Sequence, residues 1–305
     1  MSELFTPIYD EFMLMGFKEE TQVGTQIFNE IDDTTKDHKF DGISGTGEWE
    51  AANELAGGGY EDLVLAYVNT ITPLKYWKKI KVSFEATDQD EYAMLKKKCV
   101  DAQQIGKGGR VKVEKLRAAV LINGLTTAGP DGQILFSNSH PKNRIETGVT
   151  YDNLLAGPLS HDNLELAEQQ MAANYFDMKG LPIEVSENPQ IVYPPALKGV
   201  ANRLLSDRAD YRPGPTTGHS EMEINRFAGR YNPLCWRYLS AALGGSDTAW
   251  YILFKEVGFL EMVWSARPSF DSWIDKDIEA YIFKGRLMAA ASANDWRCGF
   301  ASTGL

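Results

Sequence analysis

The chain has 305 residues, enough for one large domain or two moderate ones, and its 43% hydrophobic and 24% charged residues are an ordinary globular balance. No run of 18 apolar residues or secretory signal is visible, so neither a membrane-spanning helix nor export is predicted. The net charge of −11 argues against a protein that binds nucleic acid through its phosphates, because such proteins usually present a basic surface. Three widely spaced cysteines (Cys99, Cys235 and Cys298) form no CxxC pair and indicate reduced thiols in a cytoplasm.

Residues 1–40 are expected to form an arm. Four apolar side chains can line one face of a short helix: Ile8, Phe12, Met15 and Phe17. Gly16 interrupts this helix, and the polar segment after it is expected to be extended. Such a segment buries little surface by itself, so we expect a neighbouring subunit to order it.

Residues 41–60 are rich in glycine and include the run Gly57, Gly58 and Gly59. A mobile surface loop is the simplest interpretation. Glycine permits backbone angles closed to other residues, so the run can also act as a hinge for the segment that follows.

Two strands are predicted after this loop. Residues 63–68 form a short apolar, β-prone run, and Ile80, Val82 and Phe84 alternate with polar residues. Pro73 lies between the two runs, where it disfavours strand structure. The two runs therefore predict an extended hairpin.

A long helix is predicted over 88–123, after a Thr87–Asp90 capping box. An unbroken apolar stripe supports it: Tyr92, Leu95, Cys99, Ala102, Gly106, Gly109, Val113, Leu116 and Val120. Gly106 and Gly109 lie in phase with this stripe, so we expect them to let another backbone approach closely. Two helices broken at 106–109 are the alternative, because each interior glycine costs about 1 kcal/mol relative to alanine.

The second half alternates helices and strands. Ser160 is expected to cap a helix that ends at Gly180, and Pro194-Pro195 to open another. Residues 207–220 are expected to form a long exposed loop. Strand candidates are Ile183 to Val185, Ile191-Val192, Trp250 to Phe254, Leu260 to Trp264, and Tyr281 to Met288.

Sequence motifs for metal binding, catalysis or phosphate binding are weak in this chain. None of the four histidines has a His or Cys at metal-ligand spacing. A triad of His140 with Asp131 or Asp152 lacks a GxSxG elbow, and Gly106 to Gly109 lacks phosphate-loop spacing. We therefore expect a hydrogen-bonded turn at His140-Pro141, and no catalytic, cofactor-binding or metal-binding residues. The basic clusters Lys75 to Lys81 and Lys96 to Lys98 are interpreted as solvated faces.

The most informative stretch is Gln133 to Pro141, which follows the turn Gly129-Pro130-Asp131-Gly132 and precedes Tyr151 to Leu155 and the helix after Leu159-Ser160. Later come Val192 to Leu197 and the near-terminal Asn294-Asp295-Trp296-Arg297. In this order the segments resemble the major capsid proteins of tailed bacteriophages, with the Hong Kong 97-type capsid fold, and particularly the Mu-type major head subunits. The resemblance covers roughly residues 40–300.

The resemblance implies an α+β capsid fold with a defined order of parts. These are an N-terminal arm (1–40), an E-loop region (41–86), a peripheral domain (87–180) containing the spine helix 88–123, an axial domain (181–262) and a return to the peripheral domain (263–305). Gly57, Gly58, Gly59, Pro73, Gly106 and Gly109 are then the candidate hinge and assembly residues. Lys75, Lys78 and Lys79 lie near the E-loop, but a covalent lysine–asparagine cross-link is not predicted.

The resemblance further implies a major capsid protein of the virion, assembled in the host bacterial cytoplasm. Copies would form pentamers and hexamers of an icosahedral shell that encloses double-stranded DNA without sequence-specific binding. Scaffolding, portal and decoration proteins are candidate partners, and no membrane is expected. An encapsulin-like nanocompartment shell is a same-fold alternative, and a soluble cytoplasmic enzyme is an alternative from another class.

Overall fold

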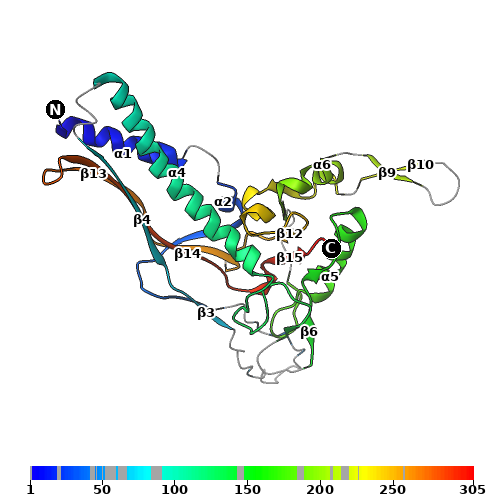
Figure 1. Cartoon of the computed structure of the whole chain (residues 1–305). Helices are drawn as coiled ribbons and strands as arrows, with labels where there is room; N and C mark the ends of the chain where they lie inside the picture. Colours follow the sequence, from blue (N-terminus) through cyan, green and yellow to red (C-terminus); the bar gives the residue numbers. More distant parts are fainter. Residues whose placement is uncertain are drawn as a thin grey trace.

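The computed structural model describes residues 2–18, 22–41, 45, 47–49, 51, 60, 67–83, 91–142, 148–183, 189–206, 209–213, 220–225, 227–256 and 258–305. The described elements form two limbs that meet near the middle of the molecule (Figure 1). The N-terminus lies at the far end of one limb and the C-terminus lies in the other (Figure 1).

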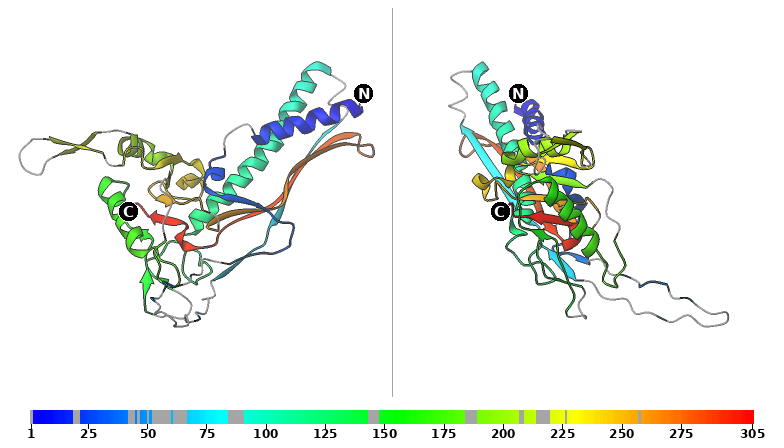
Figure 2. Two further views of the ribbon diagram at one scale, coloured as in Figure 1. Left: turned by 180° about the vertical axis from the view of Figure 1, so that it is seen from behind. Right: turned by 90° about the vertical axis from the view of Figure 1, so that its right-hand side faces the viewer.

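The first limb is a four-stranded sheet with two helices on one of its faces (Figures 1 and 2). The strand order is β1 (Asn29–Asp32), β13 (Leu260–Asp275), β14 (Ala280–Ala293) and β4 (Leu74–Ser83). β1 runs parallel to β13, and the other pairs are antiparallel. Helices α1 (Ser2–Lys18) and α4 (Glu91–Asn123) cover one face of this sheet.

The second limb contains a five-stranded sheet. Its order is β11 (Asn232–Cys235), β8 (Gln190–Tyr193), β12 (Trp250–Leu253), β15 (Gly299–Ser302) and β7 (Leu154–Leu155). β8, β12 and β15 are buried along almost their whole length, which explains their near-continuous apolar sequences. Helices α5 (His161–Asn174) and α6 (Lys198–Ser206) also belong to this limb (Figure 1).

Short elements complete the described chain. They are α2 (Gly24–Ile27), β2 (His38–Asp41), β3 (Val68–Ile71), β5 (His140–Pro141), β6 (Thr150–Tyr151), β9 (Ala209–Pro213), β10 (Ser220–Ile224), η1 (Pro195–Leu197), η2 (Arg237–Leu239), η3 (Ala241–Leu243) and η4 (Trp296–Cys298). None of the described helices is long and apolar enough to cross a bilayer.

The long helix predicted from the apolar stripe is present as a single element. α4 runs without a break from Glu91 to Asn123 and includes both in-phase glycines, so the two-helix alternative is wrong. Ala102, Gly106 and Val113 on this stripe are buried. Residues 88–90, at its predicted start, lie outside the described residues.

The prediction that residues 1–40 bury little within their own subunit is wrong. Met13, Ile27 and Phe28 are at most 1% exposed. The reason is that α1 packs on α4 and β1 adds to the edge of β13. These partners lie far away along the chain, so local polarity gave no sign of them.

The predicted hairpin has different strands from those observed. β4 is found where the alternation of Ile80 and Val82 placed it, but it pairs with β14. β3 pairs with β2 instead. Pro73 is buried between β3 and β4, where the chain passes from one sheet to the other, so it separates two pairings rather than closing one hairpin. Most of the 63–68 run lies outside the described residues.

In the second half, the Ser160 cap is confirmed, since its side chain accepts a hydrogen bond from the Asn163 N–H. The helix ends at Asn174 and not at Gly180, because Tyr175 and Phe176 turn into extended backbone that bonds to Ile183 and bridges to Pro182. The predicted loop at 207–220 is wrong in part. It contains β9 and the start of β10, which pair as an antiparallel hairpin.

Apart from the strand predicted at Ile183 to Val185, where Ile183 is not in a strand, the other predicted elements of this half are present. The second helix opens as η1 at Pro195 and continues as α6. β8, β12, β13 and β14 lie where strands were expected, and β13 and β14 are longer than their apolar runs. Val185 lies outside the described residues.

Candidate functional site

The informative sequence segments meet in one buried cluster, which we call the motif cluster: Asp131, Leu135, Ser137, His140, Asn153, Asp295, Trp296 and Arg297. His140 is completely buried and lies in β5, not in a turn as predicted. Its imidazole stacks on the Trp296 indole, with ring centroids 4.6 Å apart. Its Nδ1 lies 2.6 Å from Asp131 Oδ2, and its Nε2 lies 3.2 Å from Asn153 Oδ1.

Asn153 is the centre of this cluster. Its side-chain Nδ2 lies within 3.2 Å of three backbone carbonyl oxygens, those of Leu135, Trp296 and Gly299. Its Oδ1 accepts a hydrogen bond from the Ser137 N–H at 2.8 Å. One side chain thus joins the 133–141 stretch to the end of the chain, which lies more than 140 residues later.

The arrangement is suited to holding segments together. Both ring nitrogens of His140 face cluster oxygens, and Ser137 Oγ pairs with Ser139 Oγ at 3.1 Å. The Arg297 guanidinium makes hydrogen bonds to both oxygens of Asp295 and to the Phe176 carbonyl. Burial raises the pKa of the neighbouring Cys298 thiol and of Tyr175. The sequence analysis singled out the segments that contain these residues, but it did not predict that the segments meet in one cluster.

A second buried network joins α4 to the N-terminal segment. The Arg117 guanidinium donates to Glu114 at 3.1 Å, to Gln22 at 2.9 Å and to Glu30 at 2.6 Å. Glu114 also accepts from the Trp236 indole N–H at 2.8 Å and the Gly24 N–H at 3.3 Å. Arg117 and Glu114 are buried, so this network ties α2 and β1 to both limbs.

The candidate spine glycines lie where α1 crosses α4. A Cβ atom on Gly106 would overlap the Met13 carbonyl oxygen, and one on Gly16 would overlap the Gln103 carbonyl oxygen. Gly109 is less constrained, since its Cβ would meet the Phe17 ring at 3.4 Å. The close backbone approach expected at the in-phase glycines is therefore present at Gly106 and comes from the arm helix.

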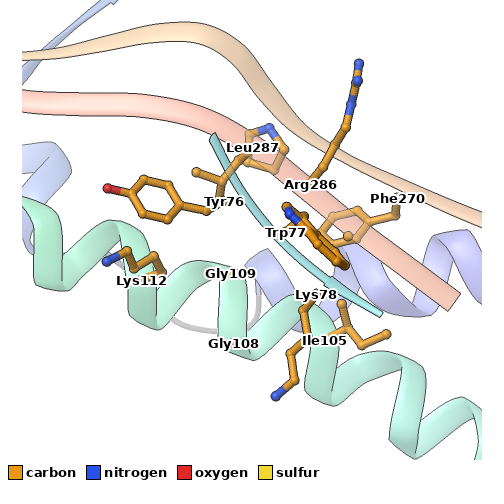
Figure 3. A pocket seen from close by; sticks show the side chains of 12 residues that line it. Tyr76, Trp77, Lys78, Ile105, Gly108, Gly109, Lys112, Phe270, Arg286 and Leu287 are labelled. Atoms are coloured by element: carbon orange, nitrogen blue, oxygen red, sulfur yellow. The ribbon is translucent and has the colours of Figure 1, made fainter. Parts of the chain in front are cut away.

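Beside this crossing, a cavity of about 290 Å³ separates α4 from the sheet (Figure 3). Its lining is mainly apolar and includes Tyr76, Ile105, Phe270 and Leu287 together with the bare backbone at Gly108 and Gly109. The Lys112 ammonium lies 4.3 Å from the Tyr76 ring centroid and closes one side.

The candidate hinge lies at the β2–β3 hairpin. Gly57, Gly58 and Gly59 are outside the described residues. The hairpin base is fixed to β14, because the Asn69 amide donates to Ser292 Oγ, the Ala293 carbonyl and Asn294 Oδ1 at 2.8 to 3.2 Å. Asn294 in turn donates to the buried Glu261 carboxylate at 2.9 Å, and burial raises the pKa of Glu261.

At the start of β2 in this base, His38 lies 2.6 Å from Asp33. Hydrogen bonds from the Thr35 backbone and from His38 lower the pKa of Asp33 to about 2. Thr72, next to Pro73, donates to Asp37 at 2.6 Å. These contacts hold the described base of the hairpin in place.

The described residues contain no group of three or more His, Cys, Asp or Glu side chains that could hold a metal ion. The described architecture thus combines a long helix along an elongated sheet, a second mixed sheet and two buried networks. Residues 67–302 match the model of the phage capsid protein family. This is more than half of the chain, which therefore belongs to that family and is a capsid shell protein.

Solved structures have the same fold. The mature capsid of bacteriophage PhiM1 aligns with a TM-score of 0.56 and 11% identity over 94% of this chain and 88% of that one. The capsid of cyanophage P-SCSP1u gives 0.54 and 14% over 90% and 85%. A virus-like particle from Pyrococcus furiosus gives 0.51 and 10% over 98% and 99%. No curated protein sequence matches.

Proposed function

We propose that this chain is the major head subunit of a tailed phage, with a Hong Kong 97-type fold and kinship to Mu-type head subunits. Copies form hexamers and pentamers of an icosahedral shell that encloses double-stranded DNA. The family match over residues 67–302 supports this proposal most strongly. The net charge of −11 fits it, because an acidic wall does not trap the packaged polymer by counterion release.

In this proposal the limb of α4 and the four-stranded sheet is the peripheral domain, and α4 is the spine. Residues 181–262 form most of the axial domain, with β7 and β15 completing its sheet. The β2–β3 hairpin and the residues between its strands are the E-loop. Virion localisation, assembly in the host cytoplasm, and scaffolding, portal and decoration partners belong to the same proposal.

The hinge belongs to this proposal as well. Hexamers and pentamers differ in curvature, so the same chain must fit several slightly different environments. Gly57, Gly58 and Gly59 would let the E-loop swing, while Asn69 and the buried Pro73 hold its base. Assembly then adjusts the loop and leaves α4 unchanged.

Size and shape test the assembly. The full chain is expressed in bacteria, and the product is examined by sedimentation and negative-stain electron microscopy. We expect megadalton shells of uniform diameter. A monomer or small oligomer under all assembly conditions would contradict the proposal and favour the enzyme alternative. Shells that always enclose one cargo protein would favour the nanocompartment alternative.

The hinge has its own test. Replacing Gly57, Gly58 and Gly59 with alanine should give folded subunits that form aberrant or incomplete particles. Normal shells of one diameter from this triple variant would rule the hinge out and leave the shell function intact.

A further inference from the structure

The cavity between α4 and the sheet of the first limb, which we call the α4 cavity, is large for a space inside one subunit (Figure 3). Its volume is about 290 Å³, whereas the packed interiors of proteins contain few voids larger than a water molecule. Gly108 and Gly109 contribute only bare backbone to its lining, and a Cβ on Gly108 would meet nothing within 4 Å. The space reaches the lower end of the range for small-molecule sites, which begins near roughly 300 Å³.

The walls of the α4 cavity are mainly apolar. Ile105 comes from α4 and Phe270 from β13, while Tyr76 and Leu287 are cross-strand partners in β4 and β14. A ligand between these elements contacts apolar groups on several sides. Because an apolar cavity of about 150 Å³ holds benzene, one of about 290 Å³ has room for a body of roughly eight to ten carbons.

The charged residues that line this cavity are all cations. They are Lys78, Lys112 and Arg286, and no Asp or Glu is among the lining residues, although the chain has a net charge of −11. Lys78 pairs with Gly285 in the register and shares its side of the sheet, which faces α4 because a Cβ on Gly285 would meet Ile105. Arg286 is one residue further on and points to the other side. The two lysines therefore give the α4-facing side of the cavity a positive charge.

Lys112 is placed to receive a negatively charged group. Its ammonium lies 4.3 Å from the Tyr76 ring centroid, and this contact holds it beside the apolar lining (Figure 3). The side chain is half-buried, and no carboxylate of the described residues pairs with it. Glu114, two residues along α4, is already bound by Arg117 and Trp236. An ammonium in this setting favours an anionic partner, because charge-assisted hydrogen bonds are the stronger ones.

We propose that the α4 cavity binds a small amphipathic carboxylate of the class of medium-chain fatty acids. Its hydrocarbon chain lies between α4 and the sheet, against Ile105, Phe270 and Leu287. Its carboxylate accepts hydrogen bonds from the Lys112 ammonium, and Lys78 adds to the positive charge. This site lies within a single subunit, so the inference goes beyond the shell function and does not depend on it.

Such a ligand stabilises the first limb. It contacts α4, β4, β13 and β14 at once, and these elements surround it only in the folded subunit. A molecule that binds the folded state and not the unfolded chain raises the melting temperature in proportion to its affinity and concentration. Binding is therefore measurable as a shift in thermal unfolding.

Octanoate is the probe for this test, with the full chain kept as unassembled subunits. Octanoate below its micelle concentration should raise the melting temperature, and titration calorimetry should give one molecule bound per subunit. 1-Octanol has the same chain without the charge, and acetate has the charge without the chain. Both should bind about tenfold or more weakly, since each lacks one of the two contacts.

The role of Lys112 is tested by removing its charge. Lys112→Met should weaken octanoate binding about tenfold or more and leave 1-octanol binding nearly unchanged. Lys112→Arg should restore most of the affinity for octanoate. Lys115→Met is the matched control, because Lys115 is an exposed cation of α4 that does not line the cavity. It should bind octanoate like the unaltered subunit.

The location is tested by filling the cavity. In Gly108→Leu the new side chain enters open space, so the subunit should remain folded by circular dichroism and bind neither octanoate nor 1-octanol. Three results would overturn the proposal: no effect of octanoate on the unaltered subunit, equal losses in Lys112→Met and Lys115→Met, or unchanged binding in Gly108→Leu. If 1-octanol binds as tightly as octanoate, the cavity takes neutral apolar molecules and the carboxylate assignment is wrong.

Discussion

At the scale of single residues, neighbouring glycines of α4 have opposite requirements. A side chain at Gly106 would overlap the α1 backbone at Met13, whereas a Cβ at Gly108 would meet nothing within 4 Å. Gly106→Ala should therefore lower the free energy of unfolding by roughly 1–3 kcal/mol through overpacking. Gly108→Ala should raise it by up to about 1 kcal/mol, because alanine is the better helix former. Denaturant unfolding of unassembled subunits measures both, and equal effects would mean that α1 does not pack on α4 in solution.

Asn153 gives a second prediction at this scale. Asn153→Asp keeps the acceptor for the Ser137 N–H but removes the donor to three buried carbonyls. Each buried group left unpaired costs about 1–3 kcal/mol, so a loss of roughly 3 kcal/mol or more is expected. The same change at exposed Asn232 is the control and should cost far less. A small loss at Asn153, measured by thermal or denaturant unfolding, would show that the motif cluster does not hold the segments together.

Individual residues and segments of the candidate site could be predicted from the sequence, but the contacts between them could not. Gln133 to Pro141 and Asn294 to Arg297 stood out as segments, and Gly106 stood out by its phase on the helix. That His140 stacks on Trp296 could not be predicted, because the two are more than 150 positions apart and no local pattern links them. Hydrophobic periodicity describes which face of an element is buried, and it does not name the partner.

At the scale of elements, the anchored base of the β2–β3 hairpin should respond to pH. The pKa of Glu261 is raised above its usual 4.5 by burial, so the folded state holds the proton more tightly than the unfolded state. Stability therefore falls as pH rises from the ordinary glutamate range through the folded-state pKa, and the penalty persists above it.

Glu261→Gln removes this titration. The variant should be more stable than the unaltered subunit at pH 7, and the difference should shrink as the pH approaches 4.5. Unfolding at a series of pH values measures the gap, with exposed Glu48→Gln as the control. If the stability difference between the variant and the unaltered subunit instead grew as the pH fell, burial of the ionised Glu261 carboxylate would not be destabilising.

Elements with their own periodicity were predictable, and pairings were not. α4, the Ser160 cap and the strands β8, β12, β13 and β14 lie where their patterns placed them. The hairpin prediction was wrong because β4 has a long-range partner in β14. The loop predicted at 207–220 contains β9 and the start of β10, whose polar sequences gave no strand signal. Strand pairing depends on contacts between distant segments, and an alternating strand can satisfy its pattern against several partners.

At the scale of the whole molecule, the N-terminal segment has two parts that are held to the subunit by different contacts. Its second part is fixed within the subunit, because Arg117 binds Gln22 and Glu30 and β1 pairs with β13. Its first part, α1, is held by its crossing with α4. A chain without residues 1–40 would therefore lose strand β1 and part of the buried Arg117 network, and its core should suffer. Deleting residues 1–18 is the cleaner change, since the network and β1 remain.

That deletion should lower the stability of the subunit by a few kcal/mol and also block shells. Met13 is fully buried, and one such side chain contributes about 1.5–3 kcal/mol. Its loss uncovers Ala102 and Ile105 on α4, which then offer an apolar surface for wrong contacts. A synthetic peptide of residues 1–18 should raise the melting temperature of the shortened subunit, because a ligand that binds only the folded state stabilises it. The same peptide with Met13→Asp should fail to do so, whereas Met15→Asp, at a half-exposed position, should still work. If the deletion leaves the melting temperature unchanged and the peptide has no effect, α1 packs on a neighbouring subunit in solution and not on its own α4.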